Sequence, residues 1–175
     1  MATIIIGMGN PVLSDDSVGV KIAQELQRRL AGDNGVTAVE LHTGGMRLVE
    51  TMAGYDRAFV IDAIESGEPA GTIHKLDVAD LPKTRFAHSS HDGNLGAAFE
   101  FARAVGLRLP SEIRIWAIEA ADTATFGEKL TPSVEQAAAR VTGEILRLAR
   151  RSPRPAPPLR RLEQTASRGL QRRGE

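Results

Sequence analysis

The chain contains no cysteine among its 175 residues. This absence excludes disulfides, a thiol nucleophile, and zinc or iron–sulfur sites built on thiolates. Any metal ion bound by this chain therefore needs oxygen and nitrogen ligands. The sequence also lacks the motifs H-E-x-x-H and G-x-S-x-G, so neither a zincin nor a serine hydrolase with a nucleophile elbow is indicated.

The chain also lacks a net charge and a long apolar run. Its 22 basic and 22 acidic residues balance, so no overall attraction to nucleic acid or to a membrane surface is expected. No apolar stretch approaches the roughly 18 residues of a membrane span, and the N-terminus does not resemble a signal peptide. With 42% hydrophobic and 25% charged residues, the composition is typical of a globular domain. We expect a cytoplasmic protein with no nucleic-acid or membrane partner.

The sequence does contain an alternation of strand-like and helix-like segments. Short apolar, β-branched runs predict strands, and apolar residues at helical spacing predict helices between them. The predicted strands are 3–6, 36–41, 57–62, 72–76 and 113–118, and the predicted helices are 18–30, 44–52, 95–102 and 131–150. The alternation indicates an α/β fold, a three-layer α/β/α sandwich around a mostly parallel, twisted sheet of about five strands.

Four further segments affect the organisation. Strand 72–76 is expected to run antiparallel, because too few residues separate it from the preceding strand for a helical crossover. Segments 78–92 and 120–130 are expected to be long loops, and loops of this length usually have a function. Residues 151–175 contain four prolines and seven arginines, which predicts a disordered tail with room for a short helix near 162–170. The folded domain is thus predicted to span residues 1–150.

Three acid or imidazole side chains stand at positions that suit a binding site. Asp16 lies in the loop after the first strand, Asp62 ends the third strand, and His91 directly precedes the helix that begins near residue 95. In an open parallel sheet, ligands bind outside the carboxyl ends of the strands. Two carboxylates and one imidazole suit a divalent ion such as nickel or zinc. We therefore predict that Asp16, Asp62 and His91 form a metal site.

The aspartates also have a structural interpretation. Either Asp15 or Asp16 can cap the helix that begins near Ser17, where the helix dipole favours negative charge. The two roles coexist if Asp15 caps the helix or tethers the loop while Asp16 points into the crevice.

The histidines leave alternatives as well. His88 lies three residues before His91 and is a second candidate for the same ligand position. His91 is preferred because the adjoining helix supports it more rigidly. His42, at the end of the second strand, is expected near the same edge of the sheet.

The glycines of Gly7-Met8-Gly9 raise the alternative of a dinucleotide loop. The third glycine of G-x-G-x-x-G is missing, because Val12 occupies its position. Asp15 and Asp16 would moreover face a pyrophosphate that requires positive potential. A sharp turn from strand to loop accounts better for the two glycines.

Residues 7–19, with the sequence GMGNPVLSDDSVG, resemble the opening signature G-x-G-N-x-x-x-x-D-[DE]-x-x-G of the nickel–iron hydrogenase maturation proteases. Further segments resemble the same family: TGGM at 43–46, IDA at 61–63, PAGTI at 69–73, SH at 90–91 and LTPSV at 130–134. The resemblance covers about residues 3–149.

The resemblance implies an endopeptidase that removes the C-terminal extension of a nickel–iron hydrogenase large-subunit precursor after nickel insertion. It implies that Asp16, Asp62 and His91 are catalytic and bind nickel, which the substrate supplies and for which other divalent ions can substitute. The residues expected to support substrate and loop are Gly9, Asn10, Asp15, Thr43 and Gly45. His42 departs from the family, which usually has glycine at that position.

Two other functions remain open at this point. A non-catalytic, nickel-dependent checkpoint protein would bind the same precursor through the same ligands without cutting it. A nucleotide-binding α/β protein would bind nucleotides and be indifferent to metal.

Overall fold

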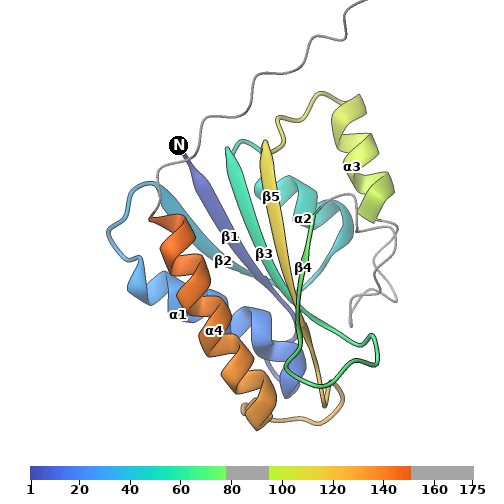
Figure 1. Cartoon of the computed structure of the whole chain (residues 1–175). Helices are drawn as coiled ribbons and strands as arrows, with labels where there is room; N and C mark the ends of the chain where they lie inside the picture. Colours follow the sequence, from blue (N-terminus) through green and yellow to red (C-terminus); the bar gives the residue numbers. More distant parts are fainter. Residues whose placement is uncertain (78–94, 151–175) are drawn as a thin grey trace, which may run out of the picture.

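A computed structural model describes residues 1–77 and 95–150 of the chain. Within these ranges five strands form one sheet in the order β2-β1-β3-β5-β4, and helices pack on both of its faces (Figure 1). The elements are β1 Thr3–Met8, the 3₁₀ helix η1 Asp15–Ser17, α1 Val18–Arg29, β2 Val36–Leu41, α2 Gly45–Met52, β3 Arg57–Ile64, β4 Ile73–Leu76, α3 Leu95–Ala104, β5 Glu112–Glu119 and α4 Pro132–Ala149.

The direction of each strand agrees with the predicted fold. Strands β2, β1, β3 and β5 run parallel, and β4 runs antiparallel to β5. The predicted direction of β4 is confirmed. Its partner is β5 rather than the preceding strand β3, because β5 occupies the place beside β3. Residues 65–72 therefore carry the chain past the end of β5, and β4 forms the last strand of the sheet beyond β5.

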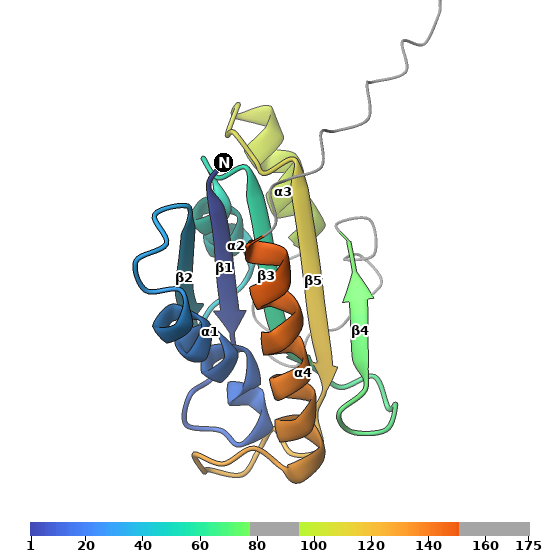
Figure 2. The same ribbon diagram turned by 60° about the vertical axis from the view of Figure 1, so that its left-hand side comes forward.

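The sheet has two apolar faces, and each is covered by two helices. Helices α1 and α4 cover one face and α2 and α3 the other (Figures 1 and 2). Side chains alternate between the faces along β3. Phe59, Ile61 and Ala63 belong to the core beneath α1 and α4, whereas Ala58 and Val60 belong to the core beneath α2 and α3. By this alternation Asp62 lies on the α2 and α3 face.

The strands are longer than the apolar runs that predicted them. Strand β1 continues to Met8 and β3 to Ile64, so Gly7 lies inside a strand and not in a turn. A Cβ atom on Gly7 would lie 2.0 Å from the carbonyl oxygen of Gly19 in α1. Gly7 thus permits helix and strand to approach closely, and the turn predicted from it was wrong at that position. The predicted loop 78–92 and the tail 151–175 lie outside the described residues.

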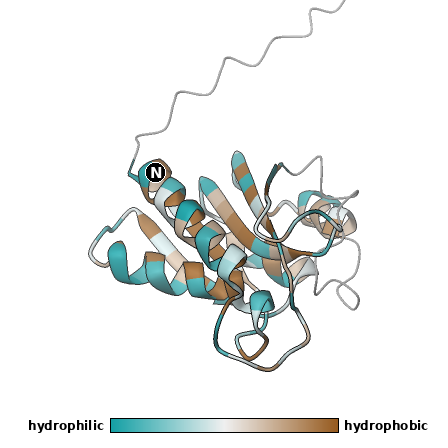
Figure 3. Cartoon of the chain, turned by 60° about the horizontal axis from the view of Figure 1, so that its bottom comes forward, coloured by the Kyte–Doolittle hydropathy of each residue, from teal (hydrophilic) through white to brown (hydrophobic). Residues whose placement is uncertain are grey.

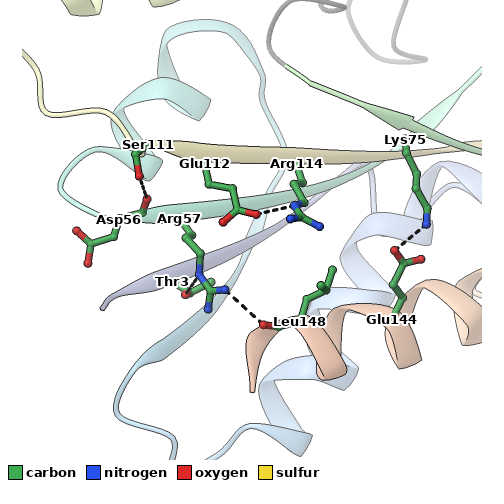
Figure 4. A network of polar contacts seen from close by, with 9 residues as sticks. All are labelled: Thr3, Asp56, Arg57, Lys75, Ser111, Glu112, Arg114, Glu144 and Leu148. Atoms are coloured by element: carbon green, nitrogen blue, oxygen red, sulfur yellow. Dashed lines mark hydrogen bonds and ion pairs between the residues drawn. The ribbon is translucent and has the colours of Figure 1, made fainter. Parts of the chain in front are cut away.

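Buried Arg57 lies at the edge of the sheet where the parallel strands begin, which we call the amino edge. It joins β3 to β1 and to the end of α4 (Figure 4). Its Nε donates to Thr3 Oγ1 at 3.0 Å, and its terminal nitrogens donate to the carbonyl oxygens of Leu148 at 3.4 Å and Ala149 at 3.5 Å. The last carbonyls of a helix lack partners within the helix and carry partial negative charge. Arg57 therefore fixes the C-terminal end of α4 against the sheet. Across the described ranges, no helix has the length and apolarity to cross a membrane.

Candidate active site

The carboxyl ends of β1, β3 and β5 lie at one edge of the sheet, together with the loops that follow them (Figure 3). The loop after β1 leads into η1, which contains Asp16, and Asp62 is the third residue from the end of β3. A Cβ on Gly19 would lie 2.4 Å from the carbonyl oxygen of Ile61, so the start of α1 packs directly on β3 beside Asp62. This close packing brings Asp16 and Asp62 together at the carboxyl edge.

Asp62 is 2% exposed, and its ionisation is strongly perturbed. Burial raises its pKa to about 8; a hydrogen bond from the Ala63 N–H at 2.8 Å opposes this effect, and the charge of Asp16 adds to it. Near neutral pH, Asp62 thus keeps a proton that an ordinary aspartate would lose. Neighbouring carboxylates that resist joint ionisation are typical of functional sites, where a proton or a cation relieves their repulsion.

Asp16 is 1% exposed, and its position depends on the loop before it. The backbone N–H of Asn10 donates to Asp16 Oδ2 at 2.9 Å. Gly9 has a φ of 132°, and a Cβ there would lie 1.8 Å from the carbonyl oxygen of Asp16. Glycine is therefore required for the loop to fold back over η1. The structure places Gly9 and Asn10, two of the predicted supporting residues, in direct contact with Asp16.

Asp15 has a different role from its neighbour. It is fully buried, and its carboxylate accepts hydrogen bonds from the backbone N–H groups of Ala121 at 2.9 Å, Asp122 at 3.1 Å and Thr131 at 2.7 Å, and from the Thr131 hydroxyl at 2.9 Å. Neither η1 nor α1 has a side-chain capping bond at its N-terminus. The capping interpretation of Asp15 is therefore wrong, and the tether interpretation describes the structure. Thr131 directly precedes α4, which begins with Pro132, one residue after the predicted start at residue 131.

The other predicted residues at this edge follow β2. His42 is exposed, and its Nδ1 lies 3.0 Å from the carbonyl oxygen of Gly9, an acceptor to which the ring nitrogen donates. His42 thus links the end of β2 to the loop that positions Asp16. Thr43 is exposed and Gly45 begins α2, so both lie after the same strand end.

The third predicted ligand, His91, and its alternative, His88, lie outside the described residues. Helix α3 begins at Leu95, in agreement with the helix predicted to follow His91. Among residues 1–77 and 95–150, no group of three His, Cys, Asp or Glu side chains is arranged to hold a metal ion. The structure therefore joins two of the three predicted ligands, and the complete metal site stays a prediction.

One buried acid at this edge was missed by the sequence reasoning. Glu119, the last residue of β5, is 2% exposed and accepts hydrogen bonds from the Ser66 N–H at 2.8 Å, the Ser66 hydroxyl at 2.7 Å and the Gly67 N–H at 2.8 Å. Burial by itself would raise the pKa of Glu119, but these hydrogen bonds and nearby His74 hold it below its usual value. Glu119 anchors the turn between β3 and β4. The available signal for Glu119 was its position directly after the mostly apolar run 113–118 of the predicted strand.

Comparison with known proteins agrees with this architecture. A family model described as hydrogenase maturation protease matches residues 20–148. The hydrogenase expression/formation protein HupD of Bradyrhizobium diazoefficiens is 29% identical over 133 residues, which are 75% of this chain and 69% of that protein. The hydrogenase 2 maturation protease of Escherichia coli K12 is 34% identical over 83 residues, which are 47% of this chain and 51% of that protein.

A solved structure is similar over a larger share of both chains. The hydrogenase maturating endopeptidase HybD from E. coli superposes with a TM-score of 0.73 and 27% sequence identity, over 86% of this chain and 93% of that chain. These similarities confirm the predicted α/β fold and the predicted enzyme class, an endopeptidase of hydrogenase maturation.

Proposed function

The chain belongs to the hydrogenase maturation protease family, and we propose that it removes the C-terminal extension of a nickel–iron hydrogenase large-subunit precursor once nickel has been inserted. Its partner in this proposal is that precursor, and the reaction takes place in the cytoplasm. The observation that carries the proposal is the pair of buried carboxylates, Asp16 and Asp62, held at the edge of the sheet where α/β proteins bind ligands.

The two carboxylates suit a divalent ion as their third partner. Burial raises the pKa of Asp62, the charge of Asp16 adds to this effect, and a bound cation would replace the proton that Asp62 retains. Carboxylate oxygens together with an imidazole nitrogen match the ligands that nickel or zinc accepts. We assign this role to Asp16 and Asp62, with His91 as the imidazole.

The nickel is proposed to arrive with the precursor and not to reside in this protein. The chain has no cysteine, so it contributes no thiolate to hold the ion on its own. When bound, a divalent ion can polarise a carbonyl group or lower the pKa of a bound water. A precursor without nickel would then leave the site incomplete, which makes cleavage conditional on nickel insertion.

The residues of this chain prepare the site for that substrate. The N–H groups of Asn10 and Ala63 each orient one carboxylate by donating to a single oxygen. Asp62 has to release its proton before it can serve as an anionic ligand. Burial of both acids keeps bulk water away and thus strengthens their interaction with a cation.

The test combines purified protein with nickel-loaded and nickel-free precursor, and mass spectrometry of the precursor's C-terminus reports cleavage. We expect the wild type to cut only the nickel-loaded precursor. Asp16→Asn, Asp62→Asn and His91→Ala should each reduce cleavage at least about a hundredfold, because removal of one ligand weakens both the binding and the orientation of the metal. Melting temperatures would show that the variants are folded.

His88→Ala is the matched control, since it removes a second imidazole from the same segment. It should cut like the wild type. Loss of cleavage in His88→Ala together with an active His91→Ala variant would reassign the ligand. Efficient cutting of nickel-free precursor would refute the role given to nickel, and tight nickel-dependent binding without any cleavage would instead identify a checkpoint protein.

A further inference from the structure

Two large apolar side chains at the carboxyl edge are exposed to solvent. Phe126, in the loop after β5, is 80% exposed, and Val12, in the loop after β1, is 52% exposed. Within the described residues, Phe126 is the most exposed of the large apolar side chains. We call Val12 and Phe126 the apolar tip.

The two loops that carry the apolar tip are joined by backbone hydrogen bonds. Leu13 and Phe126 form an isolated antiparallel bridge. The N–H of Gly127 donates to the Val12 carbonyl at 3.1 Å, and the N–H of Ser14 donates to the Thr125 carbonyl at 3.0 Å. Phe126 therefore lies opposite Leu13, next to Val12 along the same paired ribbon, although 114 positions separate Val12 and Phe126 along the sequence.

The exposure of the tip does not result from a loose loop. The hydroxyl of Ser14 donates to the carbonyl of Lys129 at 2.9 Å, and the buried carboxylate of Asp15 holds both ends of the same loop through Ala121 and Thr131. Burial of a phenylalanine side chain would contribute about 2 kcal/mol to the free energy of unfolding. The free protein does not gain this contribution from Phe126. A rigidly held, exposed aromatic residue is typical of a binding hot spot.

The tip and the candidate active site share one support. Asp15, which holds the loop of Phe126, is the immediate neighbour of Asp16 in η1. Val12 precedes Asp16 by only a few residues in the same loop. A protein that presents a peptide to Asp16 and Asp62 therefore meets the apolar tip at the same edge of the sheet.

We infer that the apolar tip docks the substrate protein, through an apolar surface of the hydrogenase large-subunit precursor that lies outside the bond to be cut. The inference rests on the proposed function for the identity of this partner. A buried phenylalanine covers about 150–250 Å², far below the roughly 800 Å² per partner of a stable interface. The tip alone is too small to hold a second copy of this chain, and it suits one anchor of a transient enzyme–substrate contact.

The test measures binding and cleavage of the nickel-loaded precursor separately, by calorimetry and by mass spectrometry. Phe126→Ala should weaken binding about tenfold and raise KM to match, with kcat within about twofold, because Phe126 is not one of the proposed ligands and its side chain is 80% exposed, whereas Asp16 is 1% exposed. Val12→Ala should have a smaller effect in the same direction. The melting temperature should not change, since the truncated side chain is 80% exposed.

Phe101→Ala is the matched control, because Phe101 is a 57% exposed phenylalanine on α3. It should bind and cut like the wild type. Wild-type affinity in Phe126→Ala, equal losses in both phenylalanine variants, or a dimer that dissociates on Phe126→Ala would each overturn the inference. Binding that depends on Phe126 without any cleavage would refute the proposed function and leave the docking role intact.

Discussion

The two edges of the sheet handle buried charge in opposite ways. Among the described residues, the buried acids Asp15, Asp16, Asp62 and Glu119 all lie at the carboxyl edge, whereas the buried base Arg57 lies at the amino edge. Arg57 directs its donors at a hydroxyl and at the carbonyl end of α4, which holds the layers together. The carboxyl edge instead concentrates charge of one sign. Buried charge at the amino edge therefore serves the fold, whereas the carboxyl edge contains Asp16 and Asp62, the acids that we propose as metal ligands.

The four buried acids at the carboxyl edge fall into two pairs. Asp15 and Glu119 each accept several hydrogen bonds from loops, so their charge is compensated by the protein itself. Asp16 and Asp62 interact with each other: burial raises the pKa of Asp62, and the charge of Asp16 adds to this effect. Burial alone therefore does not distinguish Asp16 and Asp62 from Asp15 and Glu119. What separates the two pairs is that Asp16 and Asp62 interact with each other in addition to accepting from the backbone N–H groups of Asn10 and Ala63.

The largest expected loss of stability follows from Asp15→Ala. This change leaves three backbone N–H groups and the Thr131 hydroxyl without their acceptor, and each unsatisfied buried group costs about 1–3 kcal/mol. Because water can reach part of the loop, we expect a loss of about 4 kcal/mol in the free energy of unfolding, measured by urea denaturation. Asp16→Asn is the adjacent comparison and should lose less than about 1 kcal/mol. Equal losses would show that both aspartates serve the fold.

A pH-dependent effect is expected at Asp62. Its pKa of about 8 in the folded protein exceeds the ordinary value of 3.8. Between these values the unfolded chain releases the proton and the folded protein keeps it, so the free energy of unfolding falls as pH rises through this window. Each pKa unit corresponds to about 1.4 kcal/mol, part of which local relaxation would remove.

Asp62→Asn should abolish this fall, because the amide does not titrate. Urea denaturation at pH 4 and pH 8 should show a decline in the wild type that exceeds the decline in Asp62→Asn by about 3 kcal/mol. Parallel pH profiles of the two proteins would show that Asp62 ionises normally. Asp62 would then not differ in its pKa from an ordinary aspartate.

At the amino edge, Arg57→Met should lower the free energy of unfolding by about 2 kcal/mol. Methionine keeps the apolar contacts of the side chain but gives up the bonds to Thr3 and to the last carbonyls of α4. Arg114→Met is the control, since Arg114 is half exposed and pairs with Glu112 at 2.6 Å. An exposed pair contributes about 0–1 kcal/mol. Thermal unfolding of both variants would decide whether burial makes the difference.

The smallest effect is expected for His42→Gly. The imidazole donates to the Gly9 carbonyl from an exposed position, so water can replace it at a cost below about 0.5 kcal/mol. A two- to fivefold drop in cleavage rate is expected, because Gly9 precedes the residue that orients Asp16. A variant with full loss of cleavage would give His42 a direct part in the reaction instead.

Much of this architecture follows from local patterns in the sequence. The apolar runs of β1, β2 and β3 and the helical spacing of α1 and α4 predict these elements nearly at their observed bounds. Thr131-Pro132 predicts the start of α4, and the short link before β4 predicts its direction. These features depend on neighbouring residues, whose side-chain periodicity and backbone preferences act over a few positions.

The division of labour among the acids was decided by tertiary structure. Asp15 and Asp16 are adjacent and chemically identical, so side-chain periodicity and backbone preference do not tell which one tethers a loop and which one faces Asp62; the resemblance to a known family assigned Asp16 to the site. The partner of Asp15 is Thr131, 116 positions away, and the acceptors of Arg57 at the end of α4 are 91 and 92 positions away. Likewise, the raised pKa of Asp62 depends on the packing of α1 against β3. The sequence by itself determined the elements and the strand ends that carry the acids. Only the folded chain determined which charges are compensated, because the compensating groups come from distant segments.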